Sequence, residues 1–464
     1  MKVLLLTIDA WRTTHTSFDP ASTSECTPEL ASLAEDGVVF TQAVSHGPAT
    51  PYAFPGILTS TYPLDYGGYE ELGDGRTVVS EPLSDAGWRC VGVHSNPWLG
   101  ARYGYDRGYD EYRDVGEFSL PLLDGAREVL VDRFGLDHPV YEFAQSIYRR
   151  LQAPLRMVGG GRTDEVSVAR AAFEDNAEPR SDRHGEPPDG RDLFVWAHLL
   201  EPHAPYTPPE RHRETEGVED VDATELTTRA QRDPGALSDR EQETVEGLYA
   251  ASVRHADERA GRILDAVDDD TLVIVTADHG EALFEHDSVG HPPQLWDELV
   301  RVPLLIRPPG GAAPRTDDSR TVDAQVRHVD VAPTVLDYAD VSIPGSYRGR
   351  SLRPALEGDS VPTRPAHVEV ASTESHPGRI DPEALRIGVR TPPRKLVFED
   401  DELKGYDLRR DPGERRPVDP GSDEEWARLR RTLRDRRDDI AFETGSVEFD
   451  ADTEERLRDL GYLE

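Results

Sequence analysis

Short, nearly unbroken apolar runs separated by helical stretches constrain the fold of this chain more than any other feature of its sequence. Such runs are typical of strands that are buried on both faces of a mostly parallel sheet. Their alternation with segments of helical periodicity predicts an α/β sandwich, in which helices flank one large sheet. The expected strands are Val3–Ile8, Val91–Val93, Leu193–Leu200, Leu272–Thr276 and Val302–Ile306, and the expected helices include Pro28–Asp36, Leu248–Ala266 and Val331–Ala339.

Length and changes in composition predict the domain organisation. The 464 residues exceed one ordinary domain, which favours a large core with an appendage. We assign residues 1–360 to the core and residues 361–464 to a small C-terminal subdomain with short strands at Leu385–Arg390 and Lys395–Glu399 and a charged terminal helix from Asp423.

Two variable insertions interrupt the α/β pattern. Residues 118–157 carry apolar side chains at helical spacing, which either pack on the core, the interpretation we favour, or cap the active face. Residues 176–240 contain a Pro-, Gly- and charge-rich stretch at 176–192, expected to be a loop, and an acidic stretch at 211–240, expected to be a surface insertion.

The charge balance excludes one class of partner. Asp and Glu number 90 against 52 Lys and Arg, a net charge of -38 that opposes binding to nucleic acid or to an anionic membrane. Only three of the basic residues are lysines, Lys2, Lys395 and Lys404. This preference for Arg amid so much acid resembles proteins of extreme halophiles of the haloarchaeal type, in which the acidity serves solvation.

Targeting signals and cysteines point to a cytoplasmic protein. The apolar run from Met1 to Thr7 is too short for a signal peptide, and no later run approaches the roughly 20 apolar residues of a transmembrane segment. The two cysteines, Cys26 and Cys90, cannot form a disulfide framework or a thiolate metal cluster. The sequence does not define the oligomeric state.

Polar side chains follow three of the expected strands at the point where each strand ends. Asp9 follows the first strand, Glu201 and His203 follow Leu193–Leu200, and Asp278 and His279 follow Leu272–Thr276. Each alone could be structural, Asp9 as a helix cap and each His as a hydrogen-bonded core residue. Because parallel strands bring their carboxyl ends to one edge of the sheet, we expect the five side chains to gather there.

The gathered donors predict a metal-assisted reaction. Mixed carboxylate and imidazole ligands suit a divalent ion such as Mn, Zn or Mg. Thr50, which alone could be a helix cap, precedes a helix expected to begin at Gly56–Ser60, whose amide dipole attracts an anion. An ion beside this hydroxyl would lower its pKa and neutralise charge on a tetrahedral ester oxygen, which is the chemistry of phosphate or sulfate ester cleavage.

The order of the motifs resembles the sulfatase family of the alkaline phosphatase superfamily over most of the chain. The resemblance implies an alkaline-phosphatase-like sandwich, metal ligands at Asp9, Thr50, Asp278 and His279, and Thr50 as the nucleophile. The segments that carry it are Leu5–Arg12, Thr27–Phe40, Leu58–Pro63, Glu201–Tyr206, Asp278–Glu281, Arg301–Ile306, His328–Thr334 and Tyr406–Glu414.

The same resemblance suggests further roles around the ester. Arg12 and His203 take catalytic positions, and His203 and His291 are expected to bind the substrate. In the alternative interpretation, Glu201, His203 and His291 hold a second ion. Glu201 and His203 are two residues apart, so an extended backbone would turn both to the same side.

The chain departs from the sulfatase pattern at the nucleophile. Sulfatases of this family convert a Cys or Ser within Cys/Ser-x-Pro/Ala-x-Arg into formylglycine, whereas here Thr50 is followed by Tyr52 and Phe54 in place of the Pro and Arg. Ala10 and His279 stand where calcium-dependent members often carry Asp and Asn, which favours Mn, Zn or Mg over Ca.

A Thr nucleophile is similar to that of the phosphoesterase and phosphotransferase branches, so we favour phosphate over sulfate esters. The sequence thus predicts a metal-dependent hydrolase or transferase of a small-molecule, glycan or lipid phosphate or sulfate ester. The alternative is a catalytically inactive sulfatase-like module that binds anionic glycans or lipids.

Overall fold

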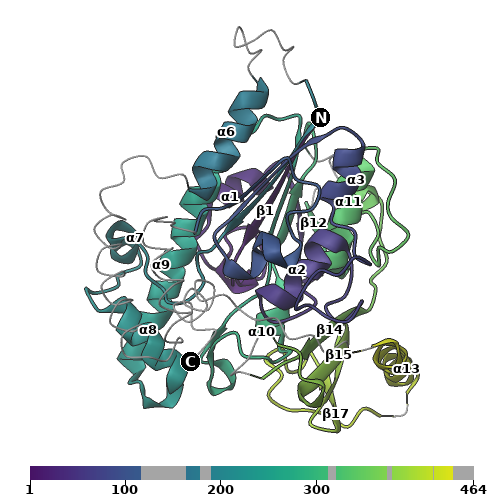
Figure 1. Ribbon diagram of the computed structural model, residues 1–464. Helices are drawn as coiled ribbons and strands as arrows, with labels where there is room; N and C mark the ends of the chain where they lie inside the picture. The colour runs from purple at the N-terminus through teal and green to yellow at the C-terminus, as the bar shows by residue number, and fades with distance from the viewer. Residues whose placement is uncertain are drawn as a thin grey trace, which may run out of the picture.

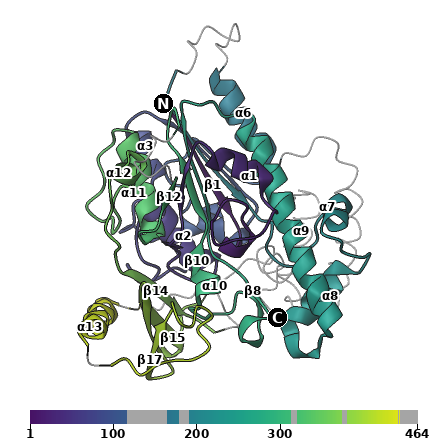
Figure 2. The ribbon, with the colours of Figure 1, turned by 180° about the vertical axis from the view of Figure 1, so that it is seen from behind.

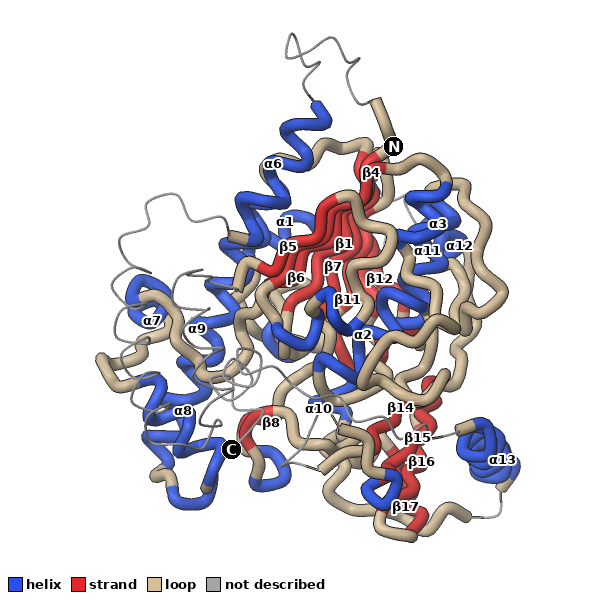
Figure 3. The backbone as a smooth tube through the Cα atoms, in the orientation of Figure 1, coloured by secondary structure: helices blue, strands red, loops and turns tan. Residues whose placement is uncertain are grey.

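An eight-stranded, mostly parallel sheet forms the centre of the molecule (Figure 3). The computed structural model describes residues 1–116, 164–177, 190–311, 320–373, 379–421, 423–440 and 442. The strands follow the order β12-β2-β11-β7-β1-β6-β4-β5. Their bounds are Thr321–Val322 (β12), Val38–Phe40 (β2), Leu304–Arg307 (β11), Thr271–Ala277 (β7), Lys2–Ile8 (β1), Leu193–Leu199 (β6), Arg89–His94 (β4) and Glu111–Asp114 (β5).

The predicted central strands are confirmed, and their register positions the carboxyl ends. Every residue of β6 and β7 is buried, as their apolar composition requires. β1 pairs in parallel with both neighbours, so that Ile8 lies opposite Leu199 on β6 and opposite Ala277 on β7. The residues that follow these three strands therefore leave the sheet side by side at one edge.

The run Val302–Ile306 is not the single strand that its apolar composition suggests. Pro303 separates β10 (Arg301–Val302), which pairs with β3 (Ala43–Val44), from β11, which runs antiparallel to β7. Proline has no backbone N–H to donate to a ladder, so the chain changes sheets at this residue.

Helices cover both faces of the sheet (Figures 1 and 2). α1 (Pro28–Ala34), α6 (Glu165–Ala177) and α9 (Asp239–Leu264) lie on one side, and α2 (Thr50–Thr59), α3 (Ser80–Asp85) and α11 (Val331–Tyr338) lie on the other. The predicted α/β sandwich is confirmed. No helix of the described residues combines the length and the apolar character needed to cross a membrane, and Cys26 and Cys90 are both buried and form no disulfide.

α9 begins at Asp239, well before the predicted start at Leu248. The Ser238 hydroxyl accepts a hydrogen bond from the backbone N–H of Glu241, and the Glu241 carboxylate accepts one from the backbone N–H of Ser238. This capping box stabilises first turns that bury few apolar side chains, so apolar periodicity alone could not reveal them.

The acidic insertion at 211–240 is mainly helical. It contains α8 (Ala223–Arg232) and most of α7 (Glu210–Thr215), and both helices pack on α9. The other insertion, 118–157, and most of the expected loop at 176–192 lie outside the described residues.

A small antiparallel sheet and a helix form the C-terminal part, as the composition predicts. β14 (Ala366–Ala371), β15 (Leu385–Thr391), β16 (Arg394–Glu399) and β17 (Glu402–Asp407) pair in sequence order. α13 (Glu424–Asp439) begins after its N-cap, Asp423, and packs on β15 and β16. The boundary at residue 360 stays a prediction.

A buried ion cluster joins α13 to the α/β core. Arg436 donates two hydrogen bonds of 2.9 and 2.7 Å to the Glu369 carboxylate on β14 and one of 2.7 Å to Asp65 in the core. All three side chains are buried. The positive charge of Arg436 overcomes the effect of burial and lowers the pKa of Asp65.

Arg436→Met is expected to lower the free energy of unfolding by about 3 kcal/mol, because it leaves two buried carboxylates without their shared cation. Denaturant unfolding at a fixed salt concentration measures this loss. Arg434→Met is the matched control, since Arg434 is exposed on the same helix. Equal stability of the two variants would show that the cluster does not hold α13 in place.

Candidate active site

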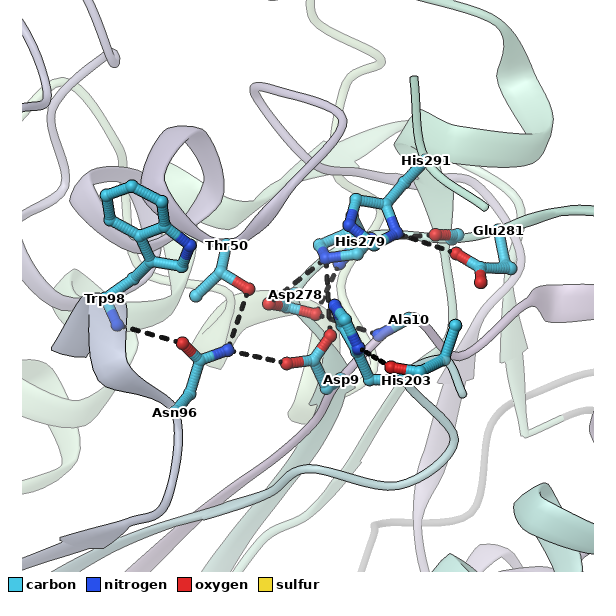
Figure 4. Close-up of polar contacts among 12 residues, drawn as sticks. Asp9, Ala10, Thr50, Asn96, Trp98, His203, Asp278, His279, Glu281 and His291 are labelled. Atoms are coloured by element: carbon cyan, nitrogen blue, oxygen red, sulfur yellow. Dashed lines mark hydrogen bonds and ion pairs between the residues drawn. The ribbon is translucent and has the colours of Figure 1, made fainter. Parts of the chain in front are cut away.

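Asp9, Asp278 and His279 meet at the carboxyl edge of the sheet (Figure 4). The backbone N–H of Asp278 donates to the Ile8 carbonyl, so the parallel ladder continues past the strand ends and sets the two carboxylates side by side. All three side chains are fully buried. His279 Nε2 lies 3.4 Å from Asp9 Oδ1 and 3.6 Å from Asp278 Oδ2.

One atom of each of these side chains has no hydrogen-bond partner among the described residues: Asp9 Oδ1, Asp278 Oδ2 and His279 Nε2. One ligand atom of each residue lies within 4.8 Å of those of the other two. The remaining polar atoms are occupied: Asp278 Oδ1 accepts from the backbone N–H of Ala10 and of His279, and His279 Nδ1 donates to the Gly280 carbonyl over 2.8 Å.

Burying three unpaired polar atoms is costly, whereas a cation placed between them would satisfy all three. The bond from His279 Nδ1 to Gly280 leaves Nε2 as the ligand atom, which is the usual arrangement of a metal-binding histidine. Two carboxylate oxygens and one imidazole nitrogen therefore fit a divalent ion of the Mn, Zn or Mg class.

Burial and neighbouring charges shift the pKa values of the three clustered side chains in different directions. Burial disfavours the Asp9 carboxylate, but the charge of His203, a hydrogen bond from His198 and the charge of His279 hold the pKa of Asp9 well below its usual value. Burial and the charge of Asp9 raise the pKa of Asp278. Burial lowers the pKa of His279, but Asp278 and Asp9 outweigh it and raise this pKa to about 9.

The raised pKa of His279 predicts that ion binding depends on pH. Below pH 9 the imidazole of the ion-free protein carries a proton that the ion must displace, so affinity should rise with pH by about tenfold per unit between pH 6.5 and 8. Calorimetry in buffers of different ionisation enthalpy should detect at least one released proton per ion. If the affinity does not change with pH and the binding heat does not change with the buffer, the ion does not bind to His279.

Thr50 lies next to this cluster and is linked to it by an asparagine. The Asn96 amide donates to Asp9 Oδ2 over 2.8 Å and to Thr50 Oγ1 over 3.1 Å. Thr50 is the first residue of α2, so the expected helix start at Gly56–Ser60 is wrong. Pro51 and Pro55 obscured the true start, although Pro51 is compatible with a first turn, where no backbone N–H is needed.

Sequence reasoning missed Asn96 and His198, and it also assigned no role to Glu281. Asn96 follows β4, and the rule that located Asp9 would have found it if it had been applied to that strand. His198 lies within β6 and places Nε2 3.2 Å from Asp9 Oδ2, while its Nδ1 lies 3.0 Å from the hydroxyl of Thr7. The only signal for His198 is an imidazole in an otherwise apolar buried strand.

His203 and His291 lie on the side of the cluster away from Asn96 (Figure 4). The His291 ring centroid is 4.6 Å from that of His279 and 4.9 Å from that of His203. His203 Nδ1 lies 2.6 Å from the Ala204 carbonyl, a contact that orients the imidazole ring. Burial lowers the pKa of His203 and outweighs the opposing charge of Asp9.

The carboxylate beside His291 is Glu281, not Glu201. Glu281 Oε2 lies 2.9 Å from His291 Nδ1, and Glu281 Oε1 accepts a 2.5 Å hydrogen bond from the Tyr206 hydroxyl. Glu201 instead forms an ion pair with Arg259. A second ion held by Glu201, His203 and His291 thus stays a prediction without geometric support for Glu201, whereas Glu281, His279 and His291 do bring ligand atoms together.

Arg12 forms an ion pair with Glu285, which is not one of the three clustered ligands. Its guanidinium donates to both carboxylate oxygens of Glu285, over 3.1 and 2.6 Å, and its backbone N–H donates to the Tyr249 hydroxyl. A cavity of about 630 Å³ lined by Arg12, Glu285 and residues of the C-terminal part lies beside it. A catalytic role for Arg12 stays a prediction.

Comparisons with known proteins relate the chain to sulfatases. A sulfatase profile matches residues 2–341, and a profile of the C-terminal region of N-sulphoglucosamine sulphohydrolase matches residues 293–441. An arylsulfatase of Clostridium perfringens is 24% identical over 373 residues, covering 71% of this chain and 73% of that protein. The uncharacterized sulfatase YidJ of Escherichia coli is 33% identical over 174 residues, which cover 36% of this chain and only 32% of that protein.

Solved structures share the fold over nearly the whole chain. The phosphonate monoester hydrolase of Agrobacterium radiobacter superposes with a TM-score of 0.66 at 19% identity and covers 95% of both chains. At this identity the likeness concerns the fold alone.

Proposed function

The chain belongs to the sulfatase family, and we propose that it is a metal-dependent hydrolase or transferase of phosphate or sulfate esters that uses Thr50 as its nucleophile. One observation carries this proposal. The unpaired ligand atoms of Asp9, Asp278 and His279 converge in a buried position that Asn96 connects to the Thr50 hydroxyl. A purely structural cluster would pair these atoms with one another or with hydrogen-bond donors.

A divalent ion bound by Asp9, Asp278 and His279 would act as a Lewis acid that lowers the pKa of the Thr50 hydroxyl and draws charge from the ester. Asn96 orients that hydroxyl through the 3.1 Å hydrogen bond to Oγ1. Its position at the first turn of α2 adds the partial positive charge of a helix N-terminus beside the ester.

Thr50 Oγ1 then forms a bond to phosphorus or sulfur while the bond to the leaving alcohol oxygen breaks and its electron pair moves to that oxygen. The hydroxyl proton passes to solvent. His203 would, once protonated, donate a proton to the leaving oxygen, and His291, held by Glu281, lies beside it as a substrate-binding residue. Water or a second alcohol finally attacks the phosphorus or sulfur and releases Thr50.

Phosphate is the favoured ester class. Threonine has a methyl group on Cβ and is not a precursor of formylglycine, so the nucleophile of the family's sulfatases cannot form at position 50. A hydroxyl nucleophile instead forms a covalent phosphoryl ester of the kind that active-site serines and threonines form. The ions we infer are Mn, Zn or Mg, because a histidine occupies the third ligand position.

The proposal is tested by assaying matched aryl phosphate monoesters, bis-aryl phosphates and aryl sulfates. The protein is first freed of metal with a chelator and then supplied separately with Mn, Zn, Mg or Ca, in high salt because of its charge of -38. We expect turnover of a phosphate ester that requires added ion. Binding of anionic glycans or lipids without turnover of any ester, with any ion, would identify an inactive binding module instead.

A further inference from the structure

A second cluster of ligand-type side chains lies on the insertion side of the molecule, between α7 and α9, whose positions Figures 1 and 2 show. His212 belongs to α7, and His255 and Glu258 lie three residues apart on α9, so both face the same side of that helix. One ligand atom of each residue lies within 4.8 Å of the others. The two imidazole rings are 5.4 Å apart between centroids.

The hydrogen bonding of this cluster is incomplete. His212 is buried, and its Nε2 lies 2.8 Å from Glu258 Oε2, but no hydrogen bond of acceptable angle joins them, and His255 Nδ1 also has no hydrogen-bond partner among the described residues. Burial lowers the pKa of both histidines, which keeps the imidazoles neutral at pH 7. Neutral imidazole is the form that binds a metal ion.

We propose that His212, His255 and Glu258 bind a divalent ion of the zinc class, separate from the active site, that fastens α7 to α9. Two histidines and one carboxylate are ligands typical of zinc, which bonds them at about 2 Å and therefore holds their donor atoms about 3 to 4 Å apart. The observed spacing needs a movement of about 1 Å to reach that geometry. Solvent can supply a fourth ligand on the side of Glu258, which is partly exposed.

Arg211 forms an ion pair with Glu258. Its guanidinium donates to both carboxylate oxygens over 2.8 to 3.1 Å, and its side chain is more than half exposed, so it can swing into solvent. The ion and Arg211 therefore compete for the same carboxylate. Removing this guanidinium should strengthen ion binding.

The proposed site lies close to segments that carry active-site residues. α7 and α8 belong to the insertion, and α8 packs against β9 (Val289–Gly290), the strand that leads directly into His291. His255 Nε2 also lies 3.8 Å from Glu201, at the start of the loop that carries His203. An ion bound by His255 would therefore lie next to the start of the loop that carries His203.

The test is zinc titration of the full-length, chelator-treated protein, followed by calorimetry and by Co²⁺ absorption spectra as a probe of coordination. The wild type should bind two ions, and His255→Gln should lose only the site proposed here. Asp278→Asn should keep this site and lose the one at the strand ends. A wild type with a single site that His255→Gln abolishes would support this proposal while contradicting the active-site metal.

Two variants that each remove one positive charge test whether Arg211 competes with the ion for Glu258. Arg211→Gln should bind the outer ion about three- to tenfold more tightly, because one competitor for Glu258 is gone. Arg213→Gln is the control, since Arg213 pairs with Asp220 outside the cluster.

Zinc should also raise the Tm of Asp278→Asn but not of Asp278→Asn/His255→Gln. If both His212→Gln and His255→Gln fold by circular dichroism and still bind as many zinc ions as the wild type, with the same affinities, the proposal is overturned.

Discussion

Thr50→Ala is expected to lower kcat for the ester substrate by at least about 10³-fold, because it removes the attacking oxygen. The variant should fold, since Thr50 is the first helical residue of α2 and not its N-cap, which is Ala49, and alanine is a good helical residue. Steady-state kinetics with the best ester of the substrate panel measure the loss. Thr50→Ser keeps the hydroxyl that Asn96 orients and should retain most of the activity.

The Ala and Ser variants separate two explanations of a low rate. If Thr50 only positions the substrate, both should change KM more than kcat. If Thr50 is the nucleophile, the Ala variant should lose kcat while ion binding through Asp9, Asp278 and His279 persists. A near-wild-type rate in Thr50→Ala would show that water or another residue attacks the ester.

Asp278→Asn is expected to lower ion affinity by at least about 100-fold and to abolish ester turnover with it. The asparagine oxygen can still accept from the backbone N–H groups of Ala10 and His279, so the local backbone keeps its hydrogen bonds. The amide nitrogen then replaces the unpaired Oδ2 and cannot bind a cation. Elemental analysis of the purified, dialysed protein measures the bound ion directly.

Asp287→Asn is the matched control for this substitution. Asp287 is exposed nearby in sequence, and its backbone lies in the left-handed region that asparagine tolerates well. Ion content and turnover should equal those of the wild type. Full ion content in Asp278→Asn would remove this residue from the ligand set.

Burial patterns explain why the fold and part of the site were predictable. β6 and β7 are buried throughout, and β1 is buried from Val3 onward. Strands of this kind are recognisable as apolar runs, and their carboxyl ends lie at one edge of the sheet. That rule brought Asp9, Asp278 and His279 together on the basis of sequence position alone. Where solvent-exposed turns begin an element, as in α9, the apolar signal is absent and the predicted start is late.

The partners of these residues were less predictable because they depend on side-chain direction across long sequence separations. Glu201 and His203 share a strand end, yet Glu201 turns to Arg259, and Glu281 from another strand end takes the place beside His291. Asn96 reaches Asp9 and Thr50 from a third strand. Spacing along the chain carries no information about such contacts.

The most direct test of Thr50 as the nucleophile is to trap the covalent intermediate. The metal-loaded protein is mixed with the best ester substrate, quenched in acid within the first turnover and digested, and the peptide that contains Thr50 is sequenced by mass spectrometry. If Thr50 is the nucleophile, a phosphoryl or sulfuryl group should be found on its hydroxyl, and it should be absent from Thr50→Ala and from protein without its ion. Burst-phase turnover with an unmodified Thr50, or with the group on another residue, would contradict it.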